Sequence, residues 1–401
     1  MQISISRSKL NYFIDNSTKL LFFFVVALLI GMQIYYIAVS PMSNPFLEPD
    51  NYEYYLFAQL VLSSHNISIS NPYLVFPTIG FFEHPGLELM PVLLHEAIPS
   101  IPLIWDFRLL QALAVIGIYA FTLLLAKRII DYLGISRAYR YGVYIFTVGS
   151  SLLMQYTEVI EWRGTEFITA IQLCIVYLLA LYYTDYGKGG RGALREELEN
   201  MILPATLVLA ILSVWIWSGG FVNLLALVVA IPMIWLYRFV IKKHPRVWKY
   251  VAAGIALGAV ILFFAAAPVE NMISGFTAHY GLPSCTANPI NIGEIQCLNA
   301  SNGLMLVLMD LVFGAVAIVL LQDKGLFVSQ KSEYEYFIFM ILIMALLQLP
   351  LAMVYIRALS LIAPYLSLLF GFGVVAMFTE FAKRGSNPLV RAIVFLMIAI
   401  A

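Results

Sequence analysis

The chain has 401 residues, of which 62% are hydrophobic and 11% charged, and its mean hydropathy is +0.88. A soluble domain carries roughly 25% charged residues, so the composition excludes a water-soluble globular core. The net charge is zero, which argues against a nucleic-acid partner. Three cysteines are too few for a disulfide scaffold or a zinc cage.

Apolar runs long enough to cross a bilayer recur along the whole chain, since a spanning helix needs about 20 residues. They lie at 19–39, 101–126, 141–156, 167–184, 202–217, 220–237, 249–268, 303–322, 335–355, 357–379 and 388–401. The break at 218–220 leaves room only for a tight hairpin, and the run at 141–156 is short enough to be tilted or partly interfacial. The sequence therefore predicts an all-α, polytopic membrane bundle of about eleven spans.

The basic residues orient this bundle. With a cytosolic N-terminus, 20 of the 23 Lys and Arg residues fall in the inner segments, and only Arg108, Arg163 and Arg357 fall outside. This bias is typical of cytoplasmic loops. We interpret the first span as an uncleaved anchor instead of a signal peptide. Two outer loops are then long, at about 41–100 and 269–302, and long loops are often functional.

Acidic residues gather in the predicted outer regions. They are Asp50 after the first span, Glu158, Glu161 and Glu166 between the third and fourth spans, and Glu294 in the second long loop. Ionisable groups near bilayer depth are costly unless they are paired, hydrated or bound to a cation. Oxygen ligands suit Mg²⁺ or Mn²⁺. The alternative is that these acids are solvated loop residues, and for Glu158 and Glu161 solvation or pairing with Arg163 is the better interpretation.

Other polar residues at the outer face have two interpretations each. Arg357, at the outer end of a span, suits a lipid phosphate or pyrophosphate, or it snorkels to the interface. His84 in the first outer loop is within the region of a donor phosphate or metal, although a lone loop histidine is more often structural. Cys285 and Cys297 share the second long loop, where a disulfide can form in an oxidising compartment.

The order of these motifs resembles the catalytic subunit of oligosaccharyltransferase, which transfers a lipid-linked glycan to Asn in Asn-X-Ser/Thr. Five matches carry the resemblance and cover nearly the whole chain. They are Asp50 as the first-loop acid, Arg163-Gly164-Thr165-Glu166 at the paired-acid motif, Trp217-Ser218-Gly219-Gly220-Phe221 at the W-W-G-G-Y/F turn, Asn291-Ile292-Gly293-Glu294 at the T-I-x-E signature of the mobile outer loop, and Tyr355-Ile356-Arg357 with Pro364 at the arginine motif.

The resemblance implies a glycosyltransferase of the GT-C-like architecture, metal-dependent and inverting. It assigns Mn²⁺ or Mg²⁺ to Asp50, Glu166 and Glu294, the donor phosphate to Arg357 and His84, and catalysis to Asp50, Glu294 and Arg357. Asp50 and Glu294 would orient the acceptor amide, whose nitrogen is a poor nucleophile because its lone pair is delocalised.

The same resemblance implies the partners and the location. The donor is a lipid-linked oligosaccharide on a polyprenyl or dolichyl phosphate or pyrophosphate, and the acceptor is a polypeptide with Asn-X-Ser/Thr. We expect membrane lipid around the bundle and no nucleic acid. The implied location is an archaeal or bacterial cell membrane, or the endoplasmic reticulum membrane in a eukaryote, with the active site on the outer face.

The chain departs from the family pattern in several places. Gly164 stands where the paired-acid motif has its first acid, two residues before Glu166, so Glu161 or a water is the alternative ligand. Asn291 replaces the Thr of the outer-loop signature, and two spans expected after the W-G-G turn are missing. We expect residues 1–401 to be the transmembrane catalytic part, with the soluble acceptor-reading domain and its W-W-D-Y-G signature absent or supplied separately.

Three other functions compete with this interpretation. The first is a different membrane glycosyltransferase that uses a lipid-phosphate sugar and transfers to Ser/Thr or to a lipid glycan. The second is a transporter of polyprenyl-linked cargo, and the third is a non-catalytic scaffold. A transporter is expected to place polar residues at mid-membrane between broken helices, whereas most acids here fall near the outer ends of spans.

Overall fold

The structure is a computed structural model in which about half of the chain is described. The described residues are 7–39, 49–65, 85–133, 135, 137–150, 153, 164–185, 193–216, 220, 221, 223, 307–315, 341, 344, 345, 348, 349 and 359–383. No strand occurs in this part of the chain, so the all-α prediction is confirmed there.

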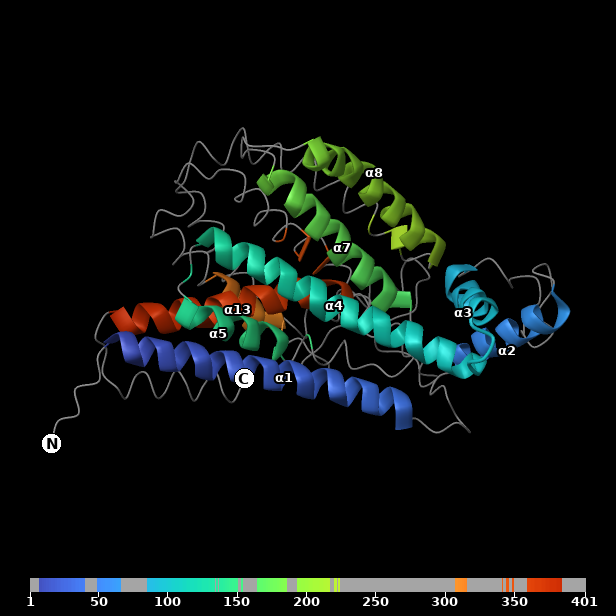
Figure 1. The fold of residues 1–401 in the computed structure, drawn as a ribbon, viewed down its shortest axis with the longest axis horizontal. Coiled ribbons are helices and arrows are strands. Elements are labelled where there is room, and N and C mark those ends of the chain that lie inside the picture. Colours follow the sequence, from blue (N-terminus) through green and yellow to red (C-terminus); the bar gives the residue numbers. More distant parts are fainter. Residues whose placement is uncertain are drawn as a thin grey trace, which may run out of the picture. The chain divides into compact units, whose positions relative to one another are not determined.

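Eight helices make up most of the described part (Figure 1). They are α1 (Arg7–Val39), α2 (Pro49–Ser64), α3 (Pro85–Ala97), α4 (Leu103–Leu133), α5 (Arg137–Val148), α7 (Gly164–Asp185), α8 (Ala193–Ile216) and α13 (Leu359–Lys383). A shorter helical segment covers residues 307–315.

Three helices among the described residues are long and apolar enough to cross a membrane. They are Leu103–Asp131, Gly164–Leu181 and Leu359–Met377, and two shorter apolar helices cover Asn16–Met32 and Pro204–Ile216. All five coincide with predicted spans, which supports the membrane prediction. The complete set of about eleven spans and their orientation stay predictions, because several lie outside the described residues.

Large apolar side chains are exposed along two helices. On α1 they include Leu20, Phe24 and Tyr35, and on α8 they include Val208 and Ile211. Soluble proteins rarely expose apolar patches of this extent. Contact with lipid acyl chains removes the cost of exposing them to water, so these faces are suited to a bilayer.

The predicted span at 141–156 differs from the structure. Helix α5 ends at Val148, and Gly149 lies in a turn whose N–H donates to the Ile145 carbonyl (2.8 Å). The 12 residues of α5 reach only about 18 Å, which is shorter than the hydrocarbon core of a bilayer. This helix therefore does not span a membrane alone.

The chain divides into two compact units. Unit 1 comprises Met1–Ala27, Thr122–Tyr156 and Ala230–Ala401, and unit 2 comprises Leu28–Phe121 and Thr157–Val229. Helices α1 and α4 each contribute residues to both units.

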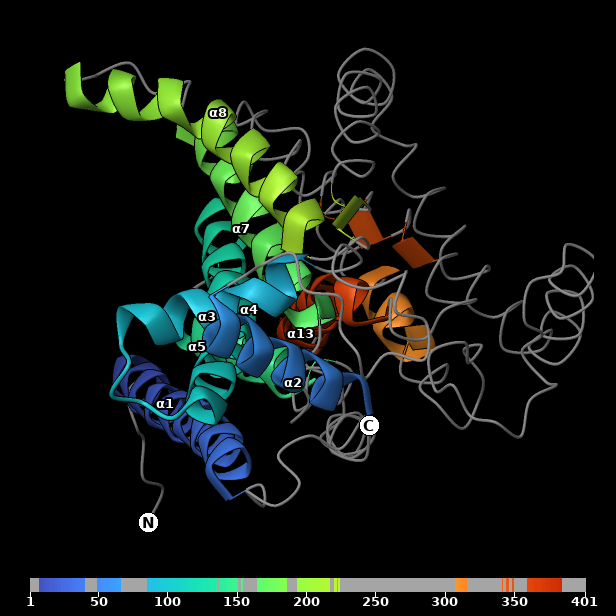
Figure 2. The same ribbon diagram turned by 90° about the vertical axis from the view of Figure 1, so that its right-hand side faces the viewer.

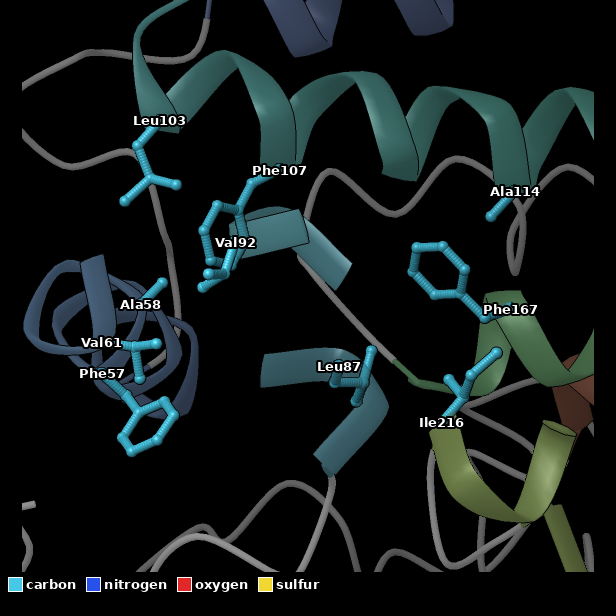
Figure 3. Close-up of a cluster of buried hydrophobic side chains, with 10 residues drawn as sticks. All are labelled: Phe57, Ala58, Val61, Leu87, Val92, Leu103, Phe107, Ala114, Phe167 and Ile216. Atoms are coloured by element: carbon cyan, nitrogen blue, oxygen red, sulfur yellow. The ribbon is translucent and has the colours of Figure 1, made fainter. Parts of the chain in front are cut away.

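Unit 2 is built around one hydrophobic cluster to which five helices contribute (Figure 3). Its buried members are Phe57, Ala58, Val61, Leu87, Val92, Leu103, Phe107, Ala114, Phe167 and Ile216. Helices α7 and α8 run side by side in Figures 1 and 2. Helix α4 packs along α7, where Gly117 faces Ala170 and the rings of Phe121 and Tyr177 lie 6.2 Å apart.

The first predicted outer loop contains two helices, which the sequence analysis did not anticipate. Helices α2 and α3 both lie within 41–100 and pack against each other. Phe57, Ala58 and Val61 recur at helical spacing on α2 and are all buried in the cluster. Tertiary burial of this apolar face explains why the segment is helical.

In unit 1, helices α5 and α13 lie side by side (Figure 1) and run antiparallel. Gly142 faces Val375, whereas Thr147 lies directly against Gly371. The residue number rises along α5 where it falls along α13, so the two helices are antiparallel. Close approach at Gly371 leaves no room for a side chain there.

Unit 1 is tied together by further contacts. The ring of Phe313 packs edge-on against Phe370, with centroids 5.0 Å apart. Phe22 of α1 contacts Tyr144 of α5, with centroids 5.3 Å apart. An ion pair of 3.1 Å joins Arg140 to Asp131 of α4. Both of its side chains are partly exposed, so it adds little stability.

Gly371→Ala places a methyl group against Thr147 and the Val143 carbonyl. Overpacking of this kind costs about 1–3 kcal/mol, so we expect a lower unfolding temperature for the detergent-solubilised protein. Gly142→Ala is the matched control, because its methyl group meets Val375 at an ordinary 3.5 Å. Equal unfolding temperatures for the two variants would contradict the α5–α13 packing.

Candidate functional site

The structure describes two of the predicted site residues, Asp50 and Glu166, and both belong to unit 2. The others lie outside the described residues, and their roles stay predictions. They are His84, Glu161, Cys285, Glu294, Cys297 and Arg357.

Asp50 is the second residue of α2 and follows Pro49 at its start. Proline is favoured at the first position of a helix because its missing N–H has no intrahelical partner there. A carboxylate in the first turn is favoured by the helix dipole. Phe57 and Ala58 anchor α2 in the core of unit 2, so Asp50 lies on a helix and not on a free loop.

Glu166 lies in the first turn of α7, and only 1% of its surface is exposed. The hydroxyl of Thr165 donates to its Oε2 at 3.4 Å, and the hydroxyl of Thr169 donates to the Thr165 carbonyl at 2.6 Å. Burying a carboxylate is costly unless it is hydrogen-bonded or neutralised. For Glu166 the alternative of a solvated loop residue is therefore wrong.

The start of α3 packs closely on the end of α8. A Cβ atom on Gly86 would lie 2.5 Å from Ile216 Cα and 2.8 Å from the Trp215 ring. Only glycine allows this approach. Gly86 and Ile216 therefore mark where the start of α3 meets the end of α8.

Beyond α8 the chain returns to the same helix. Gly220 lies directly against Ser213. The Ser213 hydroxyl donates to the Ala210 carbonyl at 2.7 Å and to the Gly220 carbonyl at 3.3 Å. This return within a few residues agrees with the tight hairpin that the break at 218–220 predicts.

Asn223 connects this turn to α7. Gln172 Nε2 donates to Asn223 Oδ1 at 2.8 Å, and Asn223 Nδ2 donates to the Ile168 carbonyl at 3.3 Å. Both bonds are buried and lie within two helical turns of Glu166. The amide of Asn223 thereby fixes the chain after the turn against the first half of α7.

Besides Asp50, two of the five predicted motifs have described residues in unit 2, with Glu166 at the start of α7 and Gly220 beyond the end of α8. Phe167 and Ile216 adjoin these motifs, and together with Leu87 at the start of α3 they belong to the same hydrophobic cluster (Figure 3). The candidate site is the start of α7 beside this cluster, with Glu166 as its described carboxylate.

A histidine–aspartate pair at the α3–α4 corner was not predicted from the sequence. His95 Nδ1 and Asp106 Oδ2 lie 2.9 Å apart, and Asp106 is completely buried. Nearby on α4, the guanidinium of Arg108 stacks on the Trp105 ring at 5.0 Å. The sequence does show an acid, Asp106, in the first turn of a spanning helix. Its partner, His95, is identified only by the packing of α3 on α4.

Among the described residues, no three His, Cys, Asp or Glu side chains gather into a group suited to a metal ion. Two of the three predicted ligands, Glu294 and the Asp50 side chain, lie outside the described residues. Glu166 and the hydroxyl of Thr165 offer only oxygen donors, which suit Mg²⁺ or Mn²⁺. The metal site stays a prediction.

No protein-family model matches the chain, and no curated protein matches its sequence. Evidence for a function comes from the residues themselves. It consists of a buried carboxylate in the first turn of a helix that is long and apolar enough to cross a membrane, and of the packing of α3, α7 and α8 in one hydrophobic cluster.

The Gln172–Asn223 contact can be tested with leucine substitutions. Asn223→Leu leaves the Gln172 amide and the Ile168 carbonyl without this partner, and losses of this kind cost about 1–3 kcal/mol. In the double variant with Gln172→Leu both partners are apolar, so we expect part of the loss to be recovered. Unfolding free energies in a double-mutant cycle measure the coupling, and purely additive losses would contradict the bond.

Proposed function

We propose that the chain is a metal-dependent, inverting oligosaccharyltransferase. It moves a glycan from a polyprenyl or dolichyl phosphate or pyrophosphate donor to Asn in an Asn-X-Ser/Thr acceptor. The observation that carries the proposal is the buried Glu166 carboxylate in the first turn of α7, beside the hydrophobic cluster of unit 2. The order of the five motifs supports the same function.

The position of Glu166 supports a membrane-bound donor. Glu166 lies at the beginning of the span Gly164–Leu181, so it is placed at one end of a membrane helix. The phosphate of a polyprenyl lipid lies at the same depth, where hydrocarbon gives way to water. In the proposed multi-pass topology, with the N-terminus in the cytosol, this end faces outward.

Each predicted site residue is assigned a role that suits its charge. Asp50 and Glu294 accept the N–H bonds of the acceptor amide and orient its nitrogen towards the sugar. Arg357 and His84 bind the donor phosphate through charge-assisted hydrogen bonds. Asp50, Glu166 and Glu294 would hold Mg²⁺ or Mn²⁺, which would supply Lewis-acid stabilisation of negative charge on the donor phosphate. Because Gly164 stands at the first acid of the paired-acid motif, Glu161 or a water would complete the ligands.

One observation favours the alternative function, a different membrane glycosyltransferase activity. Gly164 is the first residue of α7, so the helix begins without the first acid of the family motif. A donor site with fewer acids also suits transfer of a lipid-phosphate sugar to Ser/Thr or to a lipid glycan. The acceptor separates the two activities.

Transfer activity should depend on both described acids. We expect Glu166→Gln and Asp50→Asn to lower glycan transfer to an Asn-X-Thr peptide by at least about 100-fold, as removal of a transition-state contact does. Membranes that contain the chain and a lipid-linked oligosaccharide provide the assay, with Mn²⁺ added after chelation. Glu96→Gln is the control, because Glu96 is exposed at the end of α3.

Two results of this assay would contradict the proposal. One is wild-type transfer by a folded Glu166→Gln variant. The other is transfer to a Ser/Thr or lipid acceptor, dependent on Glu166, with none to Asn; that result selects the second glycosyltransferase activity.

The proposed orientation can be tested with single cysteines in a background that lacks Cys174, Cys285 and Cys297. Ser100→Cys lies in the outer region and is expected to react with a membrane-impermeant thiol reagent in intact cells. Ser136→Cys lies in an inner segment and is expected to react only after permeabilisation. The reverse pattern would show that the N-terminus faces outward.

A further inference from the structure

Unit 1 contains a buried carboxylate that the proposed function does not use. Asp310 lies in the helical segment 307–315, and only 4% of its surface is exposed. This segment packs on α13, where Gly314 contacts Leu369 and the rings of Phe313 and Phe370 meet. The Ser150 hydroxyl donates to Asp310 Oδ2 at 3.5 Å, joining the end of α5 to this segment.

Two further hydroxyls lie on the helices that pack at this place. Thr147 of α5 lies directly against Gly371 of α13, and Ser367 is one turn before Gly371 on α13. Ser367 is completely buried. Asp310, Ser150 and Ser367 therefore come from three segments that pack together in unit 1.

Three buried hydroxyls on α5 and α13 lack hydrogen-bond partners among the described atoms. They are Thr147 Oγ1, Tyr365 Oη and Ser367 Oγ. Leaving a buried polar group unsatisfied costs about 1–3 kcal/mol. Such groups in a native protein indicate an additional ligand, a bound water or an ion.

The charge of Asp310 identifies the class of ligand. Within the described part of unit 1, its one hydrogen bond comes from the neutral Ser150 hydroxyl, and no ion pair joins it to a cationic side chain. A carboxylate at this depth needs one positive charge. A divalent ion would leave one excess positive charge beside the single Asp310 carboxylate. A proton would neutralise Asp310 but would leave the Thr147 and Ser367 oxygens without a partner.

We propose that Asp310, Ser150, Thr147 and Ser367 form a buried Na⁺ site in unit 1. Carboxylate and hydroxyl oxygens are suitable ligands for a hard cation. One carboxylate and one monovalent ion together are neutral, which reduces the cost of burial in a membrane. The site is independent of the proposed glycan transfer, because it uses neither Asp50 nor Glu166.

The test is the unfolding temperature of the purified full chain in detergent, titrated with NaCl, KCl or choline chloride at constant ionic strength. We expect a saturable increase that is specific to Na⁺, because a ligand that binds only the folded state stabilises it. Asp310→Asn should abolish the increase. Ser367→Ala and Thr147→Ala should each weaken the apparent Na⁺ affinity by roughly three- to tenfold.

Ser360→Ala is the control, because Ser360 is buried on α13 two turns from Ser367 and should leave the Na⁺ affinity unchanged. An equal increase with choline would overturn the proposal, as would an undiminished Na⁺ effect in Asp310→Asn. If Asp310→Asn does not fold, unchanged affinity in both hydroxyl variants overturns it. Glycan transfer is not measured, so this result is distinguishable from failure of the proposed function.

Discussion

The constraint on which the structure depends is that polar groups inside a bilayer must find partners within the protein. Backbone groups meet it by forming helices, and every regular element in the described part of the chain is a helix. Side chains meet it by pairing across helices. Gln172 bonds Asn223, Ser150 bonds Asp310, and His95 pairs with Asp106. These pairs also hold together segments that are distant in sequence.

The same constraint applies to Glu166, whose buried carboxylate needs stabilising partners. Its carboxylate is buried at the first turn of α7, where the helix dipole and the Thr165 hydroxyl stabilise it. Around it the hydrophobic cluster of unit 2 fixes the start of α3 and the end of α8. A rigid shell of this kind is what a catalytic carboxylate needs, because its position must not change when charge develops on a donor phosphate.

The sequence predicted the helices whose signal is local, and it failed where packing decides. Apolar runs located α4, α7 and α13, and the glycine break predicted the return of Gly220 onto Ser213. Helices α2 and α3 were not predicted, because their apolar faces are short and are recognisable only from their burial in the hydrophobic cluster. The partner of Asp310 could not be predicted, because Ser150 is 160 residues away. For the site, motif order selected Glu166, but only the packing of α3 and α8 shows that it is buried.

The most direct test of the proposed function is a structure of the protein with Mn²⁺, in which anomalous scattering locates the ion. The account predicts one Mn²⁺ bound by a Glu166 oxygen at about 2.0–2.2 Å, with oxygens of Asp50 and Glu294 in the same coordination shell. An ion bound elsewhere, or a Glu166 carboxylate that contacts only protein atoms while Mn²⁺ saturates the sample, would contradict it.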